Sequence, residues 1–124
     1  MAEYTFYEGE AFKIDYSLTY SPNWSDSSKR GLPIPRSALS EVYFWVKTLA
    51  TDTTAWLKLD DTSPTKIVWL DETNGRFRVL FPSSTEGHTG DRQPFECRVK
   101  LTDGSFITVD TGYINILESI VDVG

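Results

Sequence analysis

The sequence has very few of the side chains that usually bind metals or perform nucleophilic chemistry. Its 124 residues contain one cysteine, Cys97, and one histidine, His88. A single cysteine permits no disulfide within the chain, and one cysteine with one histidine supplies too few ligands for a zinc site. We therefore expect no cofactor and no bound metal. Calcium stays open, because four aspartates lie in or beside predicted loops, although solvated turn carboxylates are the favoured interpretation. These are Asp52, Asp60, Asp61 and Asp71.

Basic charge is also scarce. The chain has 12 lysines and arginines against 18 aspartates and glutamates, which gives a formal net charge of −6. Duplex nucleic acids and anionic membranes attract basic surfaces. We therefore expect neither a nucleic acid nor a membrane among the partners.

Long hydrophobic runs are lacking as well. No apolar stretch approaches the length of about 18 residues that a membrane-spanning helix needs. Residues 1–8 have neither the basic region nor the apolar region of a signal peptide. We therefore expect no transmembrane segment and no secretion signal.

Aromatic residues, by contrast, are abundant, with 4 Trp, 6 Tyr and 7 Phe. Many of them follow a period of two, which is the period of a strand with one buried face. The first strand is predicted from five apolar residues that alternate with polar ones: Phe12, Ile14, Tyr16, Leu18 and Tyr20. Further strands are predicted over 41–49, 56–59, 67–70, 76–81, 95–101, 106–110 and 113–117.

Turn-forming residues separate these segments. Asn74-Gly75 and Asp103-Gly104 are predicted hairpin turns, since Asn, Asp and Gly tolerate positive φ. Residues 21–36 and 82–94 are predicted to be long polar loops. Seven or eight strands with this spacing are typical of an all-β sandwich or barrel. We expect one such domain over residues 8–124, preceded by an N-terminal arm over residues 1–7.

No set of residues stands out as catalytic. Ser84, His88 and Asp91 lie in one polar loop, but nothing around them resembles the strained turn that exposes a catalytic serine. Cys97 lies on the apolar side of its strand, so we expect it to be buried. We therefore predict that the protein is not an enzyme, with a small hydrolase or lyase as the weakest alternative.

The aromatic residues point instead to an interaction surface. In the predicted strand over 41–49, Val42, Phe44 and Val46 face one side while Tyr43 and Trp45 face the other, so both faces are apolar. The second face needs a cover, either from the same chain or from another subunit. Aromatic residues of this strand, of the arm and of two loops are therefore the predicted interface: Tyr4, Phe6, Tyr7, Trp24, Tyr43, Trp45 and Trp56. Trp24 and Trp56 could alternatively stack on sugar rings.

The order of turns and strands resembles that of one family. Asn74-Gly75 precedes the strand Arg76-Phe77-Arg78-Val79-Leu80. Further on, Phe95-Glu96-Cys97-Arg98-Val99-Lys100-Leu101 leads to Asp103-Gly104, and Gly112 precedes Tyr113-Ile114-Asn115-Ile116. Over residues 8–117, this arrangement resembles the immunoglobulin-like domain of bacteriophage upper baseplate and related tail proteins.

The resemblance implies an antiparallel immunoglobulin-like β-sandwich of seven or eight strands, with no catalytic residues to carry over. It implies a structural protein of the virion, in the tail or baseplate or as an adaptor, assembled in the host cytoplasm. The partners would be other virion proteins and further copies of the chain, as a homo-oligomer that is a trimer or hexamer rather than a dimer. The alternative is a carbohydrate-binding module or a capsid decoration protein, which would bind sugars or the virion surface through exposed aromatic residues.

Overall fold

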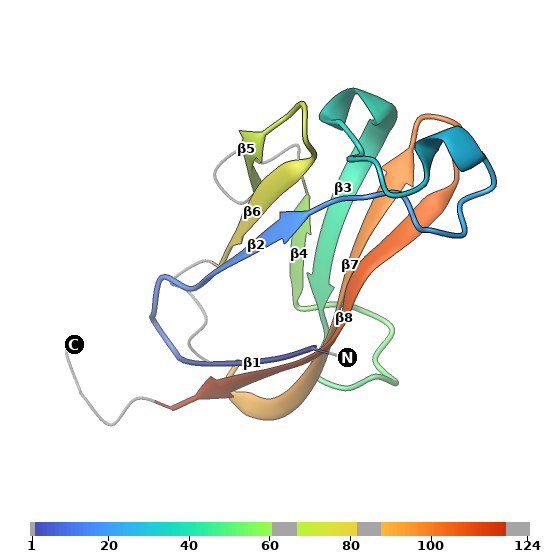
Figure 1. Cartoon of the computed structure of the whole chain (residues 1–124). Coiled ribbons are helices and arrows are strands. Elements are labelled where there is room, and N and C mark those ends of the chain that lie inside the picture. Colours follow the sequence, from blue (N-terminus) through green and yellow to red (C-terminus); the bar gives the residue numbers. More distant parts are fainter. Residues whose placement is uncertain (1, 61–66, 82–87, 119–124) are drawn as a thin grey trace.

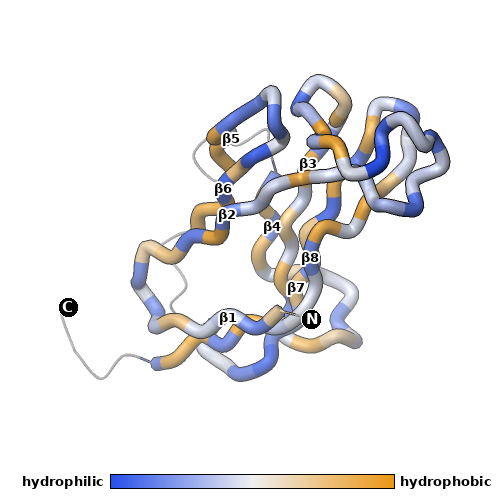
Figure 2. The backbone as a smooth tube through the Cα atoms, viewed as in Figure 1, coloured by the Kyte–Doolittle hydropathy of each residue, from blue (hydrophilic) through white to orange (hydrophobic). Residues whose placement is uncertain are grey.

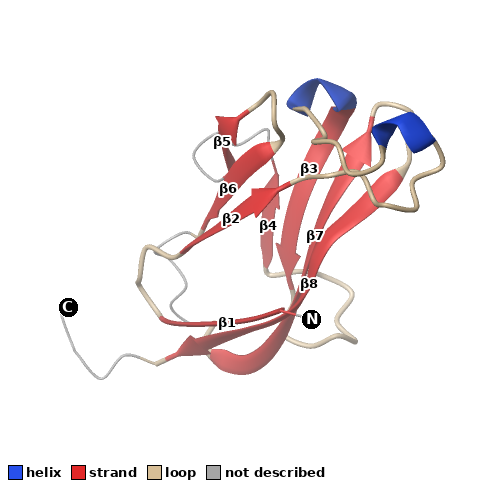
Figure 3. Ribbon diagram, viewed as in Figure 1, coloured by secondary structure: helices blue, strands red, loops and turns tan. Residues whose placement is uncertain are grey.

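Strands dominate the chain, as the period of two predicts. The computed structural model describes residues 2–60, 67–81 and 88–118, and these hold eight strands and two 3₁₀ turns, with no α-helix among them (Figure 1; Figure 3). The strands are β1 (Ala2–Tyr7), β2 (Lys13–Ser17), β3 (Leu39–Val46), β4 (Leu57–Asp60), β5 (Ile67–Asp71), β6 (Arg76–Leu80), β7 (Gly90–Leu101) and β8 (Phe106–Leu117). The turns are η1 (Ser27–Lys29) and η2 (Arg36–Ala38). The prediction of an all-β fold is therefore confirmed.

Within the described ranges, no helix is long and apolar enough to cross a membrane.

The strands form two sheets that share one hydrophobic core. The larger sheet has the order β1-β8-β7-β3-β4, and the smaller has the order β2-β6-β5. Side chains from both sheets belong to the same buried cluster, including Phe44 and Cys97 from the larger sheet and Phe77 and Val79 from the smaller. The rings of Phe44 and Phe81 meet edge to face with centroids 5.4 Å apart. Apolar and polar residues alternate along the strands, as Figure 2 shows, so each sheet buries one face.

Cys97 is fully buried, as its place on the apolar side of the strand predicted. Its partners across the sheet are Phe44 on β3 and Asp110 on β8. Burial raises the pKa of the Cys97 thiol far above its usual value. The side chain therefore acts as a small hydrophobic residue of the core.

The prediction of a free N-terminal arm is wrong. Residues 2–7 form β1, which pairs in parallel with β8 from Ala2 opposite Gly112 to Tyr7 opposite Leu117 (Figure 1). The larger sheet is therefore mixed rather than wholly antiparallel. Phe6 is only 3 % exposed, and its ring stacks on Phe12 with centroids 4.5 Å apart. The alternation in residues 2–7 is compatible with a strand, but nothing in it identifies the partner strand, which lies over a hundred positions away.

Two predicted boundaries at the C-terminal hairpin also change. The segments 106–110 and 113–117 form one continuous strand, β8, and β7 begins at Gly90 inside the predicted loop. Cys97 pairs with Asp110 while Arg98 pairs with Thr108, so Val109 is the extra residue of a β-bulge. The sequence suggests a break at Thr111-Gly112 because glycine usually interrupts strands, but Gly112 lies inside β8, where it pairs with Phe95. The bulge also shifts the side-chain alternation of β8 by one position.

The long segment between β2 and β3 is held against the end of the core. Ile34 is 1 % exposed, and its amide donates to the carbonyl of Leu18. Gly75, in the turn between β5 and β6, lies directly beneath it: a Cβ atom there would be 2.1 Å from the Ile34 carbonyl oxygen. Gly75 also has a φ of +67°. The turn therefore needs glycine for two reasons, namely its left-handed backbone and the close approach of the loop.

Replacing Gly75 with alanine should destabilise the protein by about 3 kcal/mol or more, because it adds a backbone clash to backbone strain. Gly104→Ala is the matched control, since Gly104 has a φ of +93° but open space around its Cβ position. That variant should lose only the strain of about 1–2 kcal/mol. Urea unfolding followed by fluorescence measures both free energies. Equal losses in the two variants would contradict the close approach of the loop to Gly75.

A partly buried hydrogen-bond cluster joins the two sheets. The hydroxyls of Tyr4 on β1 and Tyr16 on β2 both donate to Oδ2 of Asp110 on β8, at 2.9 Å and 2.7 Å. Burial is the largest cause that raises the pKa of each tyrosine above its usual value of 10.0, and the hydrogen bond to Asp110 adds to it. Both hydroxyls therefore stay neutral in the folded state at pH values where they would ionise in the unfolded chain.

Raising the pH through about 10 should therefore destabilise the fold, since only the unfolded chain then releases these protons. The stabilisation is fully present below the unfolded tyrosine pKa and is lost progressively above it. In Tyr16→Phe, the free energy of unfolding should fall less steeply between about pH 9 and pH 11. Tyr7→Phe is the control, because Tyr7 is 50 % exposed. Urea unfolding at each pH gives the profiles, and an unchanged slope in Tyr16→Phe would contradict the prediction.

Candidate functional site

The structure separates the seven predicted interface residues into different environments. Phe6 is a core residue, and the Tyr4 hydroxyl donates a hydrogen bond to Asp110. Trp24 is partly buried and packs on Tyr20, with ring centroids 5.2 Å apart. Placing Phe6 at an exposed interface was therefore wrong, and Tyr4 and Trp24 serve mainly to pack the fold. The error follows from treating residues 1–7 as an arm rather than as a strand with an inward face.

Trp56 is held in a small network beside the loop that leads into β7. Its indole stacks on the His88 imidazole, with ring centroids 4.1 Å apart and planes within 5° of parallel. Its Nε1–H donates to Oε1 of Gln93 at 2.8 Å, while Nε2 of Gln93 donates to the His88 carbonyl at 2.7 Å. Gln93 is only 2 % exposed, so this network satisfies a buried amide. One ring face of Trp56 is thus covered by His88 and is closed to a sugar.

The candidate catalytic and calcium-binding residues do not assemble into a site in the described ranges. His88 contacts Trp56, whereas Ser84 and Asp61 lie outside the described residues. Asp52 accepts a hydrogen bond from the amide of Leu49, and Asp71 accepts from Asn74, as carboxylates of turns do. No group of three or more possible metal ligands occurs among the residues that the structure describes.

Tyr43 and Trp45 lie together on the solvent side of the larger sheet. The alternation along β3 buries Val42 and Phe44 completely and turns Tyr43 and Trp45 outward. We call this side the outer face and define it by the outward side chains around these two residues on β3, β4, β7 and β8, together with Lys47, which directly follows β3 and lines the same side. They are Glu41, Tyr43, Trp45, Lys47, Lys58, Asp60, Glu96, Arg98, Lys100, Phe106 and Thr108.

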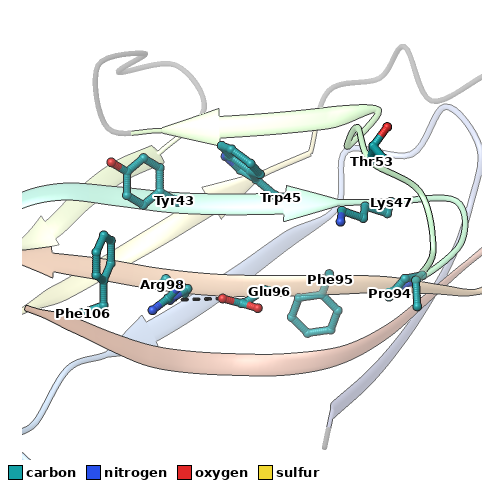
Figure 4. Close-up of a pocket in the computed structure, with 10 residues that line it drawn as sticks. Tyr43, Trp45, Lys47, Thr53, Pro94, Phe95, Glu96, Arg98 and Phe106 are labelled. Atoms are coloured by element: carbon teal, nitrogen blue, oxygen red, sulfur yellow. Dashed lines mark ion pairs between the residues drawn. The ribbon is translucent and has the colours of Figure 1, made fainter.

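An open pocket of about 610 Å³ occupies part of the outer face (Figure 4). Tyr43, Trp45 and Phe106 supply its aromatic surface. Lys47, Glu96, Arg98 and Thr53 supply polar groups, and Thr53 comes from the loop between β3 and β4 (Figure 4). The pocket is therefore a shallow, amphipathic hollow in a sheet surface.

Aromatic rings and cations are paired across this face. The Lys58 ammonium lies 4.7 Å from the centre of the Trp45 ring, and the Arg98 guanidinium lies 4.5 Å from the centre of the Phe106 ring. Arg98 also forms an ion pair with Glu96 at 3.2 Å. Trp45 and Phe106 nevertheless stay 41 % and 46 % exposed. The face thus offers apolar area and both signs of charge to a partner.

Sequence reasoning found Tyr43 and Trp45 but missed Phe106, Arg98 and Lys58. Each of the three lies beside the aromatic pair only because β4, β7 and β8 assemble around β3. Phe106 was hardest to place, because the bulge at Val109 reverses the side-chain phase between it and the second half of β8. The available signal was the alternating charged run in the second half of β7, namely Glu96, Arg98 and Lys100.

His88→Ala should cost only about 0.5–1.5 kcal/mol, because it removes one stacked ring pair. Trp56→Phe should cost more, about 1–3 kcal/mol, since it leaves the buried Gln93 carbonyl oxygen without its donor. Urea unfolding of the two variants and the parent protein measures both losses. A larger loss for His88→Ala would mean that stacking of His88 on Trp56 contributes more to the free energy of unfolding than the hydrogen bond from Trp56 to the buried Gln93.

The sequence matches no known protein family, and it matches no curated protein. Function is therefore inferred from the resemblance in the order of turns and strands, from the strand order of the sheets and from the chemistry of the outer face.

Proposed function

We propose that the chain is an immunoglobulin-like structural or adaptor protein of a bacteriophage virion, which works by self-assembly and protein-protein contacts and uses its outer face for such contacts. The strand order supports the immunoglobulin-like part of this proposal. In immunoglobulin variable-type sandwiches, strands B, E and D share one sheet and strands G, F, C and C′ share the other. The orders β2-β6-β5 and β8-β7-β3-β4 follow the same pattern along the chain.

The observation that carries the binding role is the exposed aromatic surface of the outer face. Trp45 on β3 and Phe106 on β8, with β7 between these strands, are both more than two-fifths exposed and line the same pocket. Contiguous aromatic surface bordered by charged residues marks interaction sites, and aromatic residues and arginine are enriched at protein interfaces. Arg98 and Lys58, which lie against the two rings, complete such a composition.

The geometry favours a protein partner over a sugar. A sugar-binding platform presents ring faces that are open to the ligand. Here Tyr43 stands edge-on to Trp45, with an angle of 81° between the rings, and Lys58 lies over Trp45. The other tryptophans are dispersed, since Trp24, Trp56 and Trp69 pack with different neighbours: Tyr20, His88 and Phe77.

The composition of the pocket also supports a role without catalysis. Its ionisable side chains are Lys47, Glu96 and Arg98, and its one hydroxyl besides Tyr43 is that of Thr53. An enzyme would bring a nucleophile or a general acid and base together in such a hollow. The pocket instead pairs its one carboxylate with Arg98.

Mass spectrometry of phage particles purified from a lysate of the host that carries the gene tests the virion role. We expect the chain in the particles in many copies. Trp45→Ser should reduce its incorporation at least about tenfold, which corresponds to a binding loss of about 1.4 kcal/mol. Leu70→Ser is the matched control, because Leu70 on β5 is also 41 % exposed but lies on the other sheet.

Two outcomes would contradict the proposal. Absence of the chain from purified particles would exclude a structural role in the virion. Equal incorporation of Trp45→Ser and Leu70→Ser would show that the outer face is not the attachment surface. Binding of the parent protein to a glycan array, lost in Trp45→Ser, would favour the carbohydrate-binding alternative instead.

A further inference from the structure

We infer that the partner of the outer face is the same face of a second copy of the chain, related by a two-fold axis. This inference rests on the proposed use of the outer face for protein binding and names the occupant. Three features carry it: where the exposed apolar side chains lie, how charge is divided between this face and the rest of the surface, and the presence of both signs of charge on one face.

The exposed apolar side chains single out this region. Six large hydrophobic residues are well exposed in the described ranges. Trp45 and Phe106 lie on the outer face, and Leu49 lies in the loop that forms one side of the pocket. The other three are dispersed, with Tyr7 at the far end of β8 from Phe106, Leu32 in the segment before β3, and Leu70 on the other sheet.

Burial of apolar surface against apolar surface stabilises association, whereas burial against charged surface does not. Within the described chain, the outer face is the one region that offers several large apolar side chains. A second copy can therefore cover Trp45 and Phe106 with apolar area only by presenting this same face. Such a contact is isologous, and a two-fold axis generates it.

The distribution of charge favours the same contact. The outer face carries four cations, Lys47, Lys58, Arg98 and Lys100, and three carboxylates, Glu41, Asp60 and Glu96. Its net charge is therefore +1, while the whole chain carries −6, so the rest of the chain carries −7. Contact between two copies through their other surfaces would bring net negative charge together. Contact through the outer face avoids most of this repulsion.

The two signs of charge are also suitably arranged for self-association. Glu41 on β3 lies opposite Lys100 on β7, and Lys58 on β4 lies two residues from Asp60. Because a two-fold contact brings the same face of both copies together, a face that carries both signs of charge can pair cations of one copy with carboxylates of the other. A hexamer built from three such dimers contains this contact, whereas a ring with only a three-fold axis does not.

Light scattering with size-exclusion chromatography tests the inference on the full chain. We expect the parent protein to form a dimer, or a hexamer, that dissociates on dilution. The double variant W45S/F106S should associate at least tenfold more weakly, while Leu70→Ser associates as the parent does. Circular dichroism and urea unfolding establish that each variant is folded, which is expected because both replaced side chains are more than 40 % exposed.

Charge reversal tests the two-fold arrangement itself. The variant K58E/K100E makes the outer face negative, and E41K/E96K makes it strongly positive, so each should be monomeric alone. An equimolar mixture of the two variants should restore the parent's association, because a negative outer face then meets a positive one. A monomeric parent at all concentrations, a trimer without two-fold contacts, or a mixture that stays monomeric would overturn the inference.

These outcomes are separate from those for the virion role. A chain that enters particles but is monomeric in solution overturns the self-contact and leaves the virion role standing. A chain that forms the two-fold dimer but is absent from particles overturns the virion role and leaves the self-contact standing.

Discussion

Burial of the inward side chains of β3 and β7 against the smaller sheet is the constraint on which the rest of the structure depends. Phe44 pairs with Cys97 and Val42 pairs with Val99 across the two strands, and all four are completely buried. Because side chains alternate with a period of two, this register also decides which residues face outward. A slip of one position would exchange the core for the outer face, at the cost of most of the apolar burial.

Polar side-chain contacts also join the edge strand β1 to its neighbour β8. Asn115 on β8 is 8 % exposed, and its amide donates to Glu3 Oε1 and Thr5 Oγ1 on β1. Its side-chain oxygen accepts from the amide of Arg92, the one described non-glycine residue with positive φ, at 53°. The left-handed conformation of Arg92 costs about 1–2 kcal/mol. A hydrogen bond to a buried amide group offsets part of that cost.

The same geometry that builds the core produces the candidate binding surface. Fixing Phe44 and Cys97 inward leaves Trp45 and Arg98 outward on neighbouring strands, close enough for aromatic and charged groups to meet at one pocket. Lys58 and Arg98 each rest on a ring, which lowers the freedom that their side chains have to lose on binding. This is the surface that we propose for protein contacts, and its mixed charge is compatible with a second copy of itself.

The sequence by itself determined the class of fold, the buried state of Cys97 and the outward orientation of Tyr43 and Trp45. These features depend on local alternation and on turn residues such as Asn74 and Gly75, which act over a few positions. The tertiary structure alone decided that residues 2–7 form β1, that Val109 is a bulge, and that Phe106 joins Trp45 on one face. The pairing of β1 with β8 and the placing of Phe106 with Trp45 join strands far apart in the chain, and a local pattern contains no information about which distant strand becomes the neighbour. The bulge lies within the β7–β8 hairpin, where it depends on the register between the two strands rather than on the residues of one strand alone.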